Sequence, residues 1–294
     1  MSKKLENIRK KIDLIDDKVH DLLMERAGLV GSIAEEKRKN NLQIVHPARE
    51  AMMARRLLAR HHGILPFKAV IGIWRELVGA VSMLQSGFSV IVAVPEAENT
   101  AHWDMARDYF GGVVPMKKIA SIPAAYAALR DGESTFAVLP WPRVDEPAPW
   151  WPFLIHQDHG NSPVRVICAL PYTNDSAIDP HNDGALIVSR TEFMDSGHDH
   201  SFLGFEFSSG ISRSKIIEEL KNLDLEVISL NVSFGKAGSG SSEGCLYLVE
   251  VEGFISADDS KLEKIKEAFG GSCTHLYALG GYPVLPDCTH EKKK

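Results

Sequence analysis

Residues 5–39 of the chain read LENIRKKIDLIDDKVHDLLMERAGLVGSIAEEKRK, and this stretch decides the fold of the N-terminal part. Its apolar residues recur at alternating steps of three and four, which is the spacing of one face of a long interface helix. A helix of this length measures roughly 50 Å, which is more than its own small domain can cover. The stripe therefore predicts a homodimer in which a second long helix covers it. Its members are Leu5, Ile8, Ile12, Ile15, Val19, Leu22, Leu29 and Ile33.

Arg26 interrupts this stripe at the step between Leu22 and Leu29. A guanidinium inside an interface costs several kcal/mol unless a carboxylate meets it. The same helix carries Arg9 about five turns earlier and Lys37 about three turns later. Three cations along one seam indicate an anion site. The alternative is that Arg26 pairs with an acid of a neighbouring helix and that the other two are solvated surface charges.

Two shorter helices follow, and each has a proline in its first turn, where the missing N–H costs nothing. They are expected from Pro47 to about His61 and from Pro66 to about Gln85. An apolar stripe along the later helix predicts the face that it buries. The residues of this face are Val70, Ile73, Trp74, Leu77, Val78, Val81 and Leu84.

Polar residues near the ends of these helices complete the pattern. Arg49 and Glu50 open the second helix, and Ser82 and Gln85 lie near the end of the third. One long and two short helices with cations in this order resemble the all-helical class of chorismate mutases, over roughly residues 5–86. In that family two protomers exchange their long helices and build two identical sites. The resemblance implies an all-α, helix-exchanged dimer as the head of this chain.

The resemblance also implies which residues bind the substrate, chorismate. Arg9 would act in the site of the partner subunit. Arg26 and Arg49 would bind carboxylates or organise the site, and Ser82 would help to hold a carboxylate. Glu50 would accept the ring hydroxyl of the substrate.

Two donors to the ether oxygen of the substrate are implied as well. Lys37 would be the first. The second donor of the family falls four residues after the serine, which is Ser86 here, whereas Gln85 lies one place earlier. The choice between these two residues stays open. His46 stands where the family has an aspartate, which suits a role for its backbone N–H.

These residue types suit a pericyclic rearrangement of a dianion to prephenate, which needs no nucleophile, metal or general base. A protein contributes by confining the reactive conformer and by placing positive charge where the C–O bond breaks. No cofactor and no metal are expected. A lyase that removes pyruvate from isochorismate is the alternative on the same fold. A non-catalytic amino-acid sensor, with the head used only for dimerisation, is the alternative from another class.

Composition limits the remaining possibilities. The net charge of −6 argues against a nucleic-acid surface, and no apolar run approaches the length of a membrane span. The N-terminus is charged from Lys3 onward and has no signal-peptide core, so a cytoplasmic protein is expected. The tripeptide His198-Asp199-His200 is expected in an exposed linker rather than at a metal. The four cysteines lie far apart, which fits reduced thiols: Cys168, Cys245, Cys273 and Cys288.

From Phe88 to about Arg190 the pattern changes to short apolar strands between helices, which predicts an α/β domain, assigned to residues 88–195. Strands are expected at 90–94, 136–139 and 185–188, and helices at 101–110 and 124–129.

Two segments of this domain resemble those of prephenate dehydratases. Val94-Pro95-Glu96, followed by Thr100-Ala101-His102, resembles the loop after the first strand of that family, and Ala137-Val138-Leu139-Pro140 resembles one of its strands. The chain then has Trp141-Pro142-Arg143 where that family has a Glu-Asn pair, and the strand at 185–188 lacks the Thr-Arg-Phe motif of dehydration. The domain is interpreted as a degenerate relative, without dehydratase activity. An unrelated α/β domain whose motifs match by chance is the alternative.

The last part, assigned to residues 200–287, has a βαββαβ order. Its Ala278-Leu279-Gly280-Gly281-Tyr282-Pro283 resembles the final strand and turn of ferredoxin-like ACT domains, and Gly210-Ile211-Ser212 occupies the place of their effector motif. Their Glu-Ser-Arg-Pro motif is replaced around Asn231-Val232-Ser233-Phe234, so phenylalanine binding is in doubt and a structural or dimerising role is an equal candidate. Strands are expected at 201–207, 226–233, 245–251 and 274–279, and helices at 212–223 and 261–269.

The three parts together resemble the bifunctional enzymes that join a chorismate mutase to a prephenate dehydratase. The predicted fold class is multidomain, with a helical head at residues 1–87, an α/β middle domain and an α+β ferredoxin-like C-terminal domain. Every proposed site residue lies within residues 1–88, so the sequence predicts that this fragment dimerises and has mutase activity without the later domains.

Overall fold

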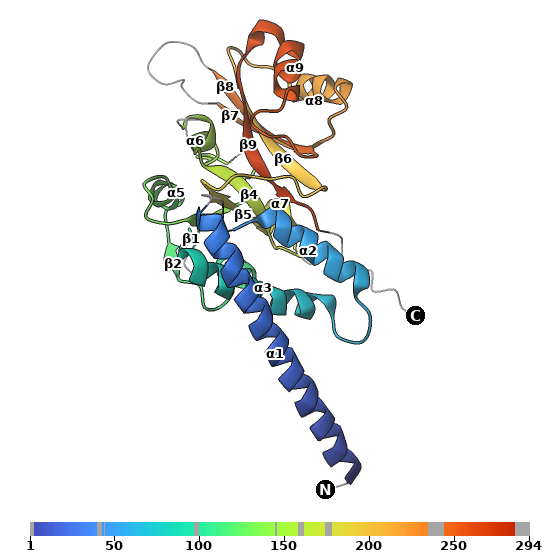
Figure 1. Cartoon of the computed structure of the whole chain (residues 1–294). Coiled ribbons are helices and arrows are strands. Elements are labelled where there is room, and N and C mark those ends of the chain that lie inside the picture. The colour runs from blue at the N-terminus through green and yellow to red at the C-terminus, as the bar shows by residue number, and fades with distance from the viewer. Residues whose placement is uncertain are drawn as a thin grey trace.

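The computed structural model describes residues 3–39, 43, 45–96, 100–144, 146–157, 162–173, 178–234 and 244–285. Within the first helix, the side chains of residues 32–35 and 37–39 lie outside this description, and so does Cys288. A helical N-terminal region precedes a mixed α/β part with a nine-stranded sheet (Figure 1).

Helix α1 (Lys3–Lys39) extends away from the body of the molecule, with the N-terminus at its far end (Figure 1). The described residues of the apolar stripe, from Leu5 to Leu29, are all exposed to solvent in the single chain, by 42% at Leu5 and 64% at Leu22. Within the part of the chain that the structure describes, nothing covers this face of α1. An apolar stripe of this length is typical of an interface.

Helices α2 (Pro47–Arg60) and α3 (Phe67–Ser86) agree with the sequence analysis to within one residue at each end. The apolar face predicted for α3 is wrong in part, because Ile73 is 51% and Leu84 79% exposed. The buried residues of α3 are instead Phe67, Ile71, Arg75 and Gly79, which recur every four residues. They face α4 and Leu285, which the sequence of the head alone does not reveal.

The first five strands form one half of the sheet in the order β2-β1-β3-β5-β4. Strand β1 runs parallel to β2 and β3, whereas β5 is antiparallel to both β3 and β4. The bounds are β1 Val90–Ala93, β2 Met116–Ile119, β3 Phe136–Pro140, β4 Arg165–Leu170 and β5 Ala185–Ser189. The sequence analysis predicted β1, β3 and β5 but not β2 and β4.

Alternate residues of these strands point to opposite faces of the sheet, and different helices cover the two faces. Val90 and Val92 face α4 (Ala101–Phe110), whereas Ile91 and Ala93 face α5 (Ile122–Arg130). Two one-turn helices, α6 (Pro152–Ile155) and α7 (Pro180–Asp183), were not predicted.

The second half of the sheet is antiparallel, in the order β9-β6-β8-β7, with α8 and α9 packed on one face. The chain passes through it in a βαββαβ order, as predicted. The bounds are β6 Asp199–Phe207, α8 Arg213–Asn222, β7 Val227–Phe234, β8 Cys245–Glu252, α9 Lys261–Ala268, a 3-10 turn at Gly270–Ser272 and β9 Cys273–Pro283.

The start of β6 corrects one expectation. The strand begins at Asp199, one residue before the start assigned to the last domain, and this residue is 2% exposed. Its carboxylate accepts hydrogen bonds from the backbone N–H and the hydroxyl of Ser196, at 2.8 and 2.6 Å. The tripeptide that contains it is therefore not an exposed linker. Within the described residues no group of histidine, cysteine and carboxylate side chains is arranged to hold a metal ion.

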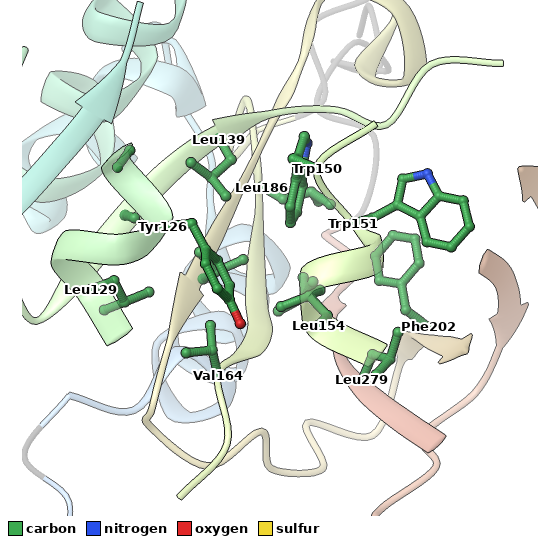
Figure 2. Close-up of a cluster of buried hydrophobic side chains, with 14 of the residues drawn as sticks. Tyr126, Leu129, Leu139, Trp150, Trp151, Leu154, Val164, Leu186, Phe202 and Leu279 are labelled. Carbon is green, nitrogen blue, oxygen red and sulfur yellow. The ribbon is translucent and has the colours of Figure 1, made fainter. Parts of the chain in front are cut away.

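The two halves of the sheet meet where Val166 of β4 pairs with Gly280 of β9. Gly280 has a φ of +90°, and a Cβ atom there would stand 2.1 Å from the Val166 carbonyl oxygen, so only glycine fits. Side chains from both halves share one core, in which Trp151 and Leu154 lie with Phe202 and Leu279 (Figure 2). The middle and last parts are thus joined by a common core as well as by the strand pair.

Candidate functional site

A cavity of about 600 Å³ lies among the three helices of the head. Five of the seven residues that the sequence analysis proposed for the site line it, and they come from all three helices. They are Arg26 of α1, Arg49 and Glu50 of α2, and Ser82 and Gln85 of α3. The other lining residues are Val30, His46, Met52, Met53, Arg56, Trp74 and Val78.

Three guanidinium groups make the cavity strongly cationic. Arg26 enters from α1, and burial lowers the pKa of its side chain. Arg49 and Arg56 enter from α2, where they stand seven residues apart and therefore on one face of the helix. Arginine forks of this kind bind carboxylates in two-pronged geometry. The arrangement can hold a small molecule with more than one negative charge.

Arg56 and Trp74 were missed by the sequence analysis. The heptad step from Arg49 to Arg56 was a signal that could have identified the third arginine. Trp74 was assigned to an apolar packing face, and it contributes an indole to the wall of the cavity instead.

Glu50 is the one carboxylate among the described lining residues, and it is already paired. Its side chain accepts hydrogen bonds from the guanidinium of Arg75 and from the hydroxyl of Tyr109, the latter at 3.3 Å. Burial alone disfavours the charge of Arg75, but the facing Glu50 carboxylate raises the pKa of this arginine above its usual value. The charge of Glu50 is thus balanced from outside the cavity, which leaves the cavity itself positive.

The two candidates for the second ether-oxygen donor differ in position. Gln85 lines the cavity, and its Nε2 donates to the Val30 carbonyl oxygen of α1 at 3.1 Å. This bond uses one of the two protons of the amide group. Ser86 is not among the lining residues, and its hydroxyl donates to the carbonyl oxygen of Ser82 at 3.0 Å.

The remaining two proposed residues are not in the cavity as described. Arg9 lies on the exposed part of α1, 17 positions before Arg26, which corresponds to roughly 25 Å along a helix. Lys37 belongs to α1, but its side chain lies outside the described residues.

A second cavity, of about 400 Å³, lies at the carboxyl ends of β1 and β3. It brings together the ends of the two segments that resemble those of prephenate dehydratases, because its lining includes Pro95 and Glu96 after β1 as well as Pro140 and Trp141 at the end of β3. Arg143 lines it too, and its guanidinium donates to the Asn182 carbonyl oxygen at 3.2 Å. The carboxyl ends of parallel strands are a common place for ligand sites.

The comparison with protein families identifies the head. Residues 8–86 match the family chorismate mutase type II. This chorismate mutase segment covers the three helices that line the cationic cavity, and it confirms the resemblance stated for the helical head.

Two curated relatives of this chain are bifunctional chorismate mutase/prephenate dehydratases. The protein of Aquifex aeolicus is 30% identical over 140 residues, which are 46% of this chain and 38% of that protein. The protein of Stutzerimonas stutzeri is 26% identical over 141 residues, again 46% of this chain and 38% of the relative. These matches contain more residues than the segment 8–86, so the likeness extends beyond it. The chain therefore spans 38% of the length of these curated relatives.

A solved structure, the prephenate dehydratase of Streptococcus mutans, is similar to 67% of this chain and 98% of its own, with 10% sequence identity and a TM-score of 0.46. Among the described helices, none has the length and the apolar character that a membrane span requires.

Proposed function

We propose that the helical head rearranges chorismate to prephenate. The observation that carries this proposal is the convergence of Arg26, Arg49 and Glu50 on one cationic cavity within the chorismate mutase segment. Chorismate carries two carboxylates and one ring hydroxyl. The cavity offers arginines for the former and a carboxylate acceptor for the latter.

Within this proposal, Arg26 and Arg49 bind the two carboxylates, with Ser82 as an additional donor to one of them. Glu50 accepts the ring hydroxyl, and its geometry is suitable because its carboxylate is held in place by Arg75. The arginine forks confine the flexible enolpyruvyl arm in the reactive conformer, which lowers the entropic part of the barrier.

Lys37 and Gln85 are proposed as the two donors to the ether oxygen. As the C–O bond breaks, negative charge accumulates on this oxygen, and a fixed cation and an amide stabilise it more than they stabilise the ground state. The position of Gln85 in the cavity favours it over Ser86 as the amide donor. No metal or cofactor enters the proposed reaction.

We further propose a homodimer in which the stripe of α1 is covered by the α1 of a second protomer and the partner's Arg9 completes each site. The uncovered apolar face of α1 supports this arrangement. The proposed protein is cytoplasmic, acts on a small molecule, and binds neither nucleic acid nor membranes.

The later parts are proposed to have no catalytic activity of their own. Trp141 and Arg143 line the second cavity, and the chain lacks the Thr-Arg-Phe motif, so we propose that residues 88–195 do not dehydrate prephenate. Residues 200–287 are proposed as a ferredoxin-like, ACT-like domain, in keeping with the order β6-α8-β7-β8-α9-β9.

The deciding experiment incubates the full-length protein with chorismate and, separately, with isochorismate, and identifies the products. Prephenate from chorismate is the expected result. Salicylate and pyruvate from isochorismate would favour the lyase, and no turnover of either substrate would favour the non-catalytic sensor.

A further inference from the structure

The ion pair between Arg75 and Glu50 is closed off from solvent. Arg75 is 4% and Glu50 8% exposed, and the guanidinium contacts the carboxylate directly. A buried carboxylate without its partner would be strongly disfavoured, so each member of the pair restrains the position of the other.

Arg75 is itself held by residues that follow the head in the sequence. Its Nε donates to the Tyr109 carbonyl oxygen at 2.6 Å, and its guanidinium lies over the Tyr109 ring, 3.7 Å from the centroid. The ring of Tyr172, just after β4, lies 4.9 Å from the same guanidinium. Contacts from two further segments therefore fix the direction of the side chain.

Glu50 lines the same cavity as three arginines that could compete with Arg75 for its carboxylate. Arg26 enters the cavity from α1, and Arg49 and Arg56 enter from α2, with His46 at the start of that helix. Without Arg75, the Glu50 carboxylate would turn toward these arginines and neutralise their charge. The groups that bind the substrate carboxylates would then be occupied by a carboxylate of the protein.

We propose that Arg75 is a positioning residue of the mutase site, which holds Glu50 toward the ring hydroxyl and keeps it away from the substrate-binding arginines. The proposal rests on the proposed function. Tyr109 of α4 extends this positioning to the α/β part, which makes that part a structural component of the site in the head.

The experiment is a double-mutant cycle on the full-length protein, with chorismate as substrate and KM and kcat measured separately. The four forms are wild type, Arg75→Met, Glu50→Gln and the double variant. Arg75→Met is expected to raise KM at least about tenfold, with a smaller effect on kcat, because substrate-binding groups are lost. In the Glu50→Gln background the same change is expected to raise KM less than about threefold, since no carboxylate is left to misplace.

Arg75→Lys keeps a cation and is expected to recover part of the lost affinity. Tyr109→Phe removes only the hydroxyl and is expected to raise KM by about two- to fivefold. These two variants keep the test valid if Arg75→Met does not fold. Arg107→Met, at an exposed arginine of α4, is the matched control and is expected to leave KM unchanged.

Equal effects of Arg75→Met in the two Glu50 backgrounds, or an unchanged KM in folded Arg75 variants, would overturn the proposal. A wild-type protein without mutase activity would instead overturn the proposed function, so the two failures are distinguishable.

Discussion

Gly79 of α3 lies directly against the backbone of Phe110 at the end of α4: a Cβ atom at residue 79 would stand 1.8 Å from the Phe110 carbonyl oxygen. Next to this contact, the carboxylate of Glu76 accepts a hydrogen bond from the Gly112 N–H at 2.9 Å. The head and the α/β part therefore share a close backbone contact at the same helix that carries Arg75.

Gly79→Ala is expected to lower the free energy of unfolding by about 1–3 kcal/mol, because α3 must move away from α4 to admit the methyl group. Gly72→Ala is the matched control on the same helix, where a Cβ meets nothing within 4 Å. It is expected to stabilise the protein by about 0.5–1 kcal/mol through helix propensity. Urea denaturation of both variants measures the difference, and equal effects would contradict the close contact.

Lys37→Ala is expected to lower kcat far more than it weakens substrate binding. The expected loss of transition-state stabilisation is on the order of 2–4 kcal/mol. Arg26→Ala is expected to impair both KM and kcat, since in the proposed reaction this arginine would contact a carboxylate from binding to product release. Steady-state kinetics on folded variants provides the measurement. Full activity in either variant would show that the site residues are assigned wrongly.

Mixed dimers test whether Arg9 acts across subunits. An inactive Arg9→Ala chain and an inactive Lys37→Ala chain are expected to regain activity after subunit exchange, because some sites then combine an intact Arg9 with an intact Lys37. Differently tagged chains allow the mixed dimers to be purified and assayed. If purified mixed dimers are inactive, Arg9 lies outside the site.

Prephenate is expected to be released rather than dehydrated. The loop after β3 carries Trp141 and Arg143, and the dehydration motif is missing from the strand β5. Phenylpyruvate formation at neutral pH is therefore expected to equal the spontaneous rate, as measured from the absorbance of the product in base. A rate that is proportional to the protein concentration would refute this expectation.

Glu250 of β8 is the centre of a buried network that predicts a pH dependence of stability. It accepts hydrogen bonds from Ser229 at 2.6 Å, from the rings of His181 and His200 at 3.0 and 3.1 Å, and from the Tyr282 hydroxyl. Burial opposes its charge, but these hydrogen bonds lower its pKa to about 2. The hydrogen bond between His181 and Glu250 raises the pKa of His181, although burial acts in the opposite direction.

These two shifts act in different pH ranges. Since folding lowers the pKa of Glu250, its contribution is present above pH ~4.5 and is lost as the pH falls toward the folded-state pKa. Since folding raises the pKa of His181, its contribution is complete below pH ~6.5 and is lost as the pH rises through the raised value. The urea concentration at the denaturation midpoint is therefore expected to decrease as the pH rises above neutral. This decrease is expected to be less steep in His181→Gln than in the wild type. His62→Gln, at an exposed histidine, is the control, and identical slopes in all three proteins would disprove this role of His181.

Part of the fold was predictable from the sequence because some helices and strands have residues of one kind on one face. The stripe of α1 follows from the period of that helix itself. The same holds for Ile228, Leu230 and Val232 of β7, which alternate with polar residues. Strand β2, with Lys117 and Lys118 at its centre, lies at the sheet edge and has no clear alternation. Strand β4 is buried along most of its length, so its apolar run has no period either.

Five of the residues that line the cavity were predictable because their order and spacing along the helices resemble those of chorismate mutases. Arg75 was not, although it is adjacent to Trp74. Its importance depends on Tyr109 and Tyr172, which approach it from later parts of the chain. The residue pattern of the head alone does not predict these contacts of Arg75.

Residue Arg55 of α2 donates hydrogen bonds to the Val284 carbonyl oxygen, 229 residues later in the chain. A ribosome releases α2 and β4 long before it releases the strand β9 that ends beside Val284. During synthesis the edge of β4 that pairs with β9 therefore stays unpaired until nearly the whole C-terminal part has been made. An unpaired apolar strand edge is a site of aggregation, and contacts so distant in sequence form slowly. The nascent chain thus exposes an apolar strand edge that the finished protein covers.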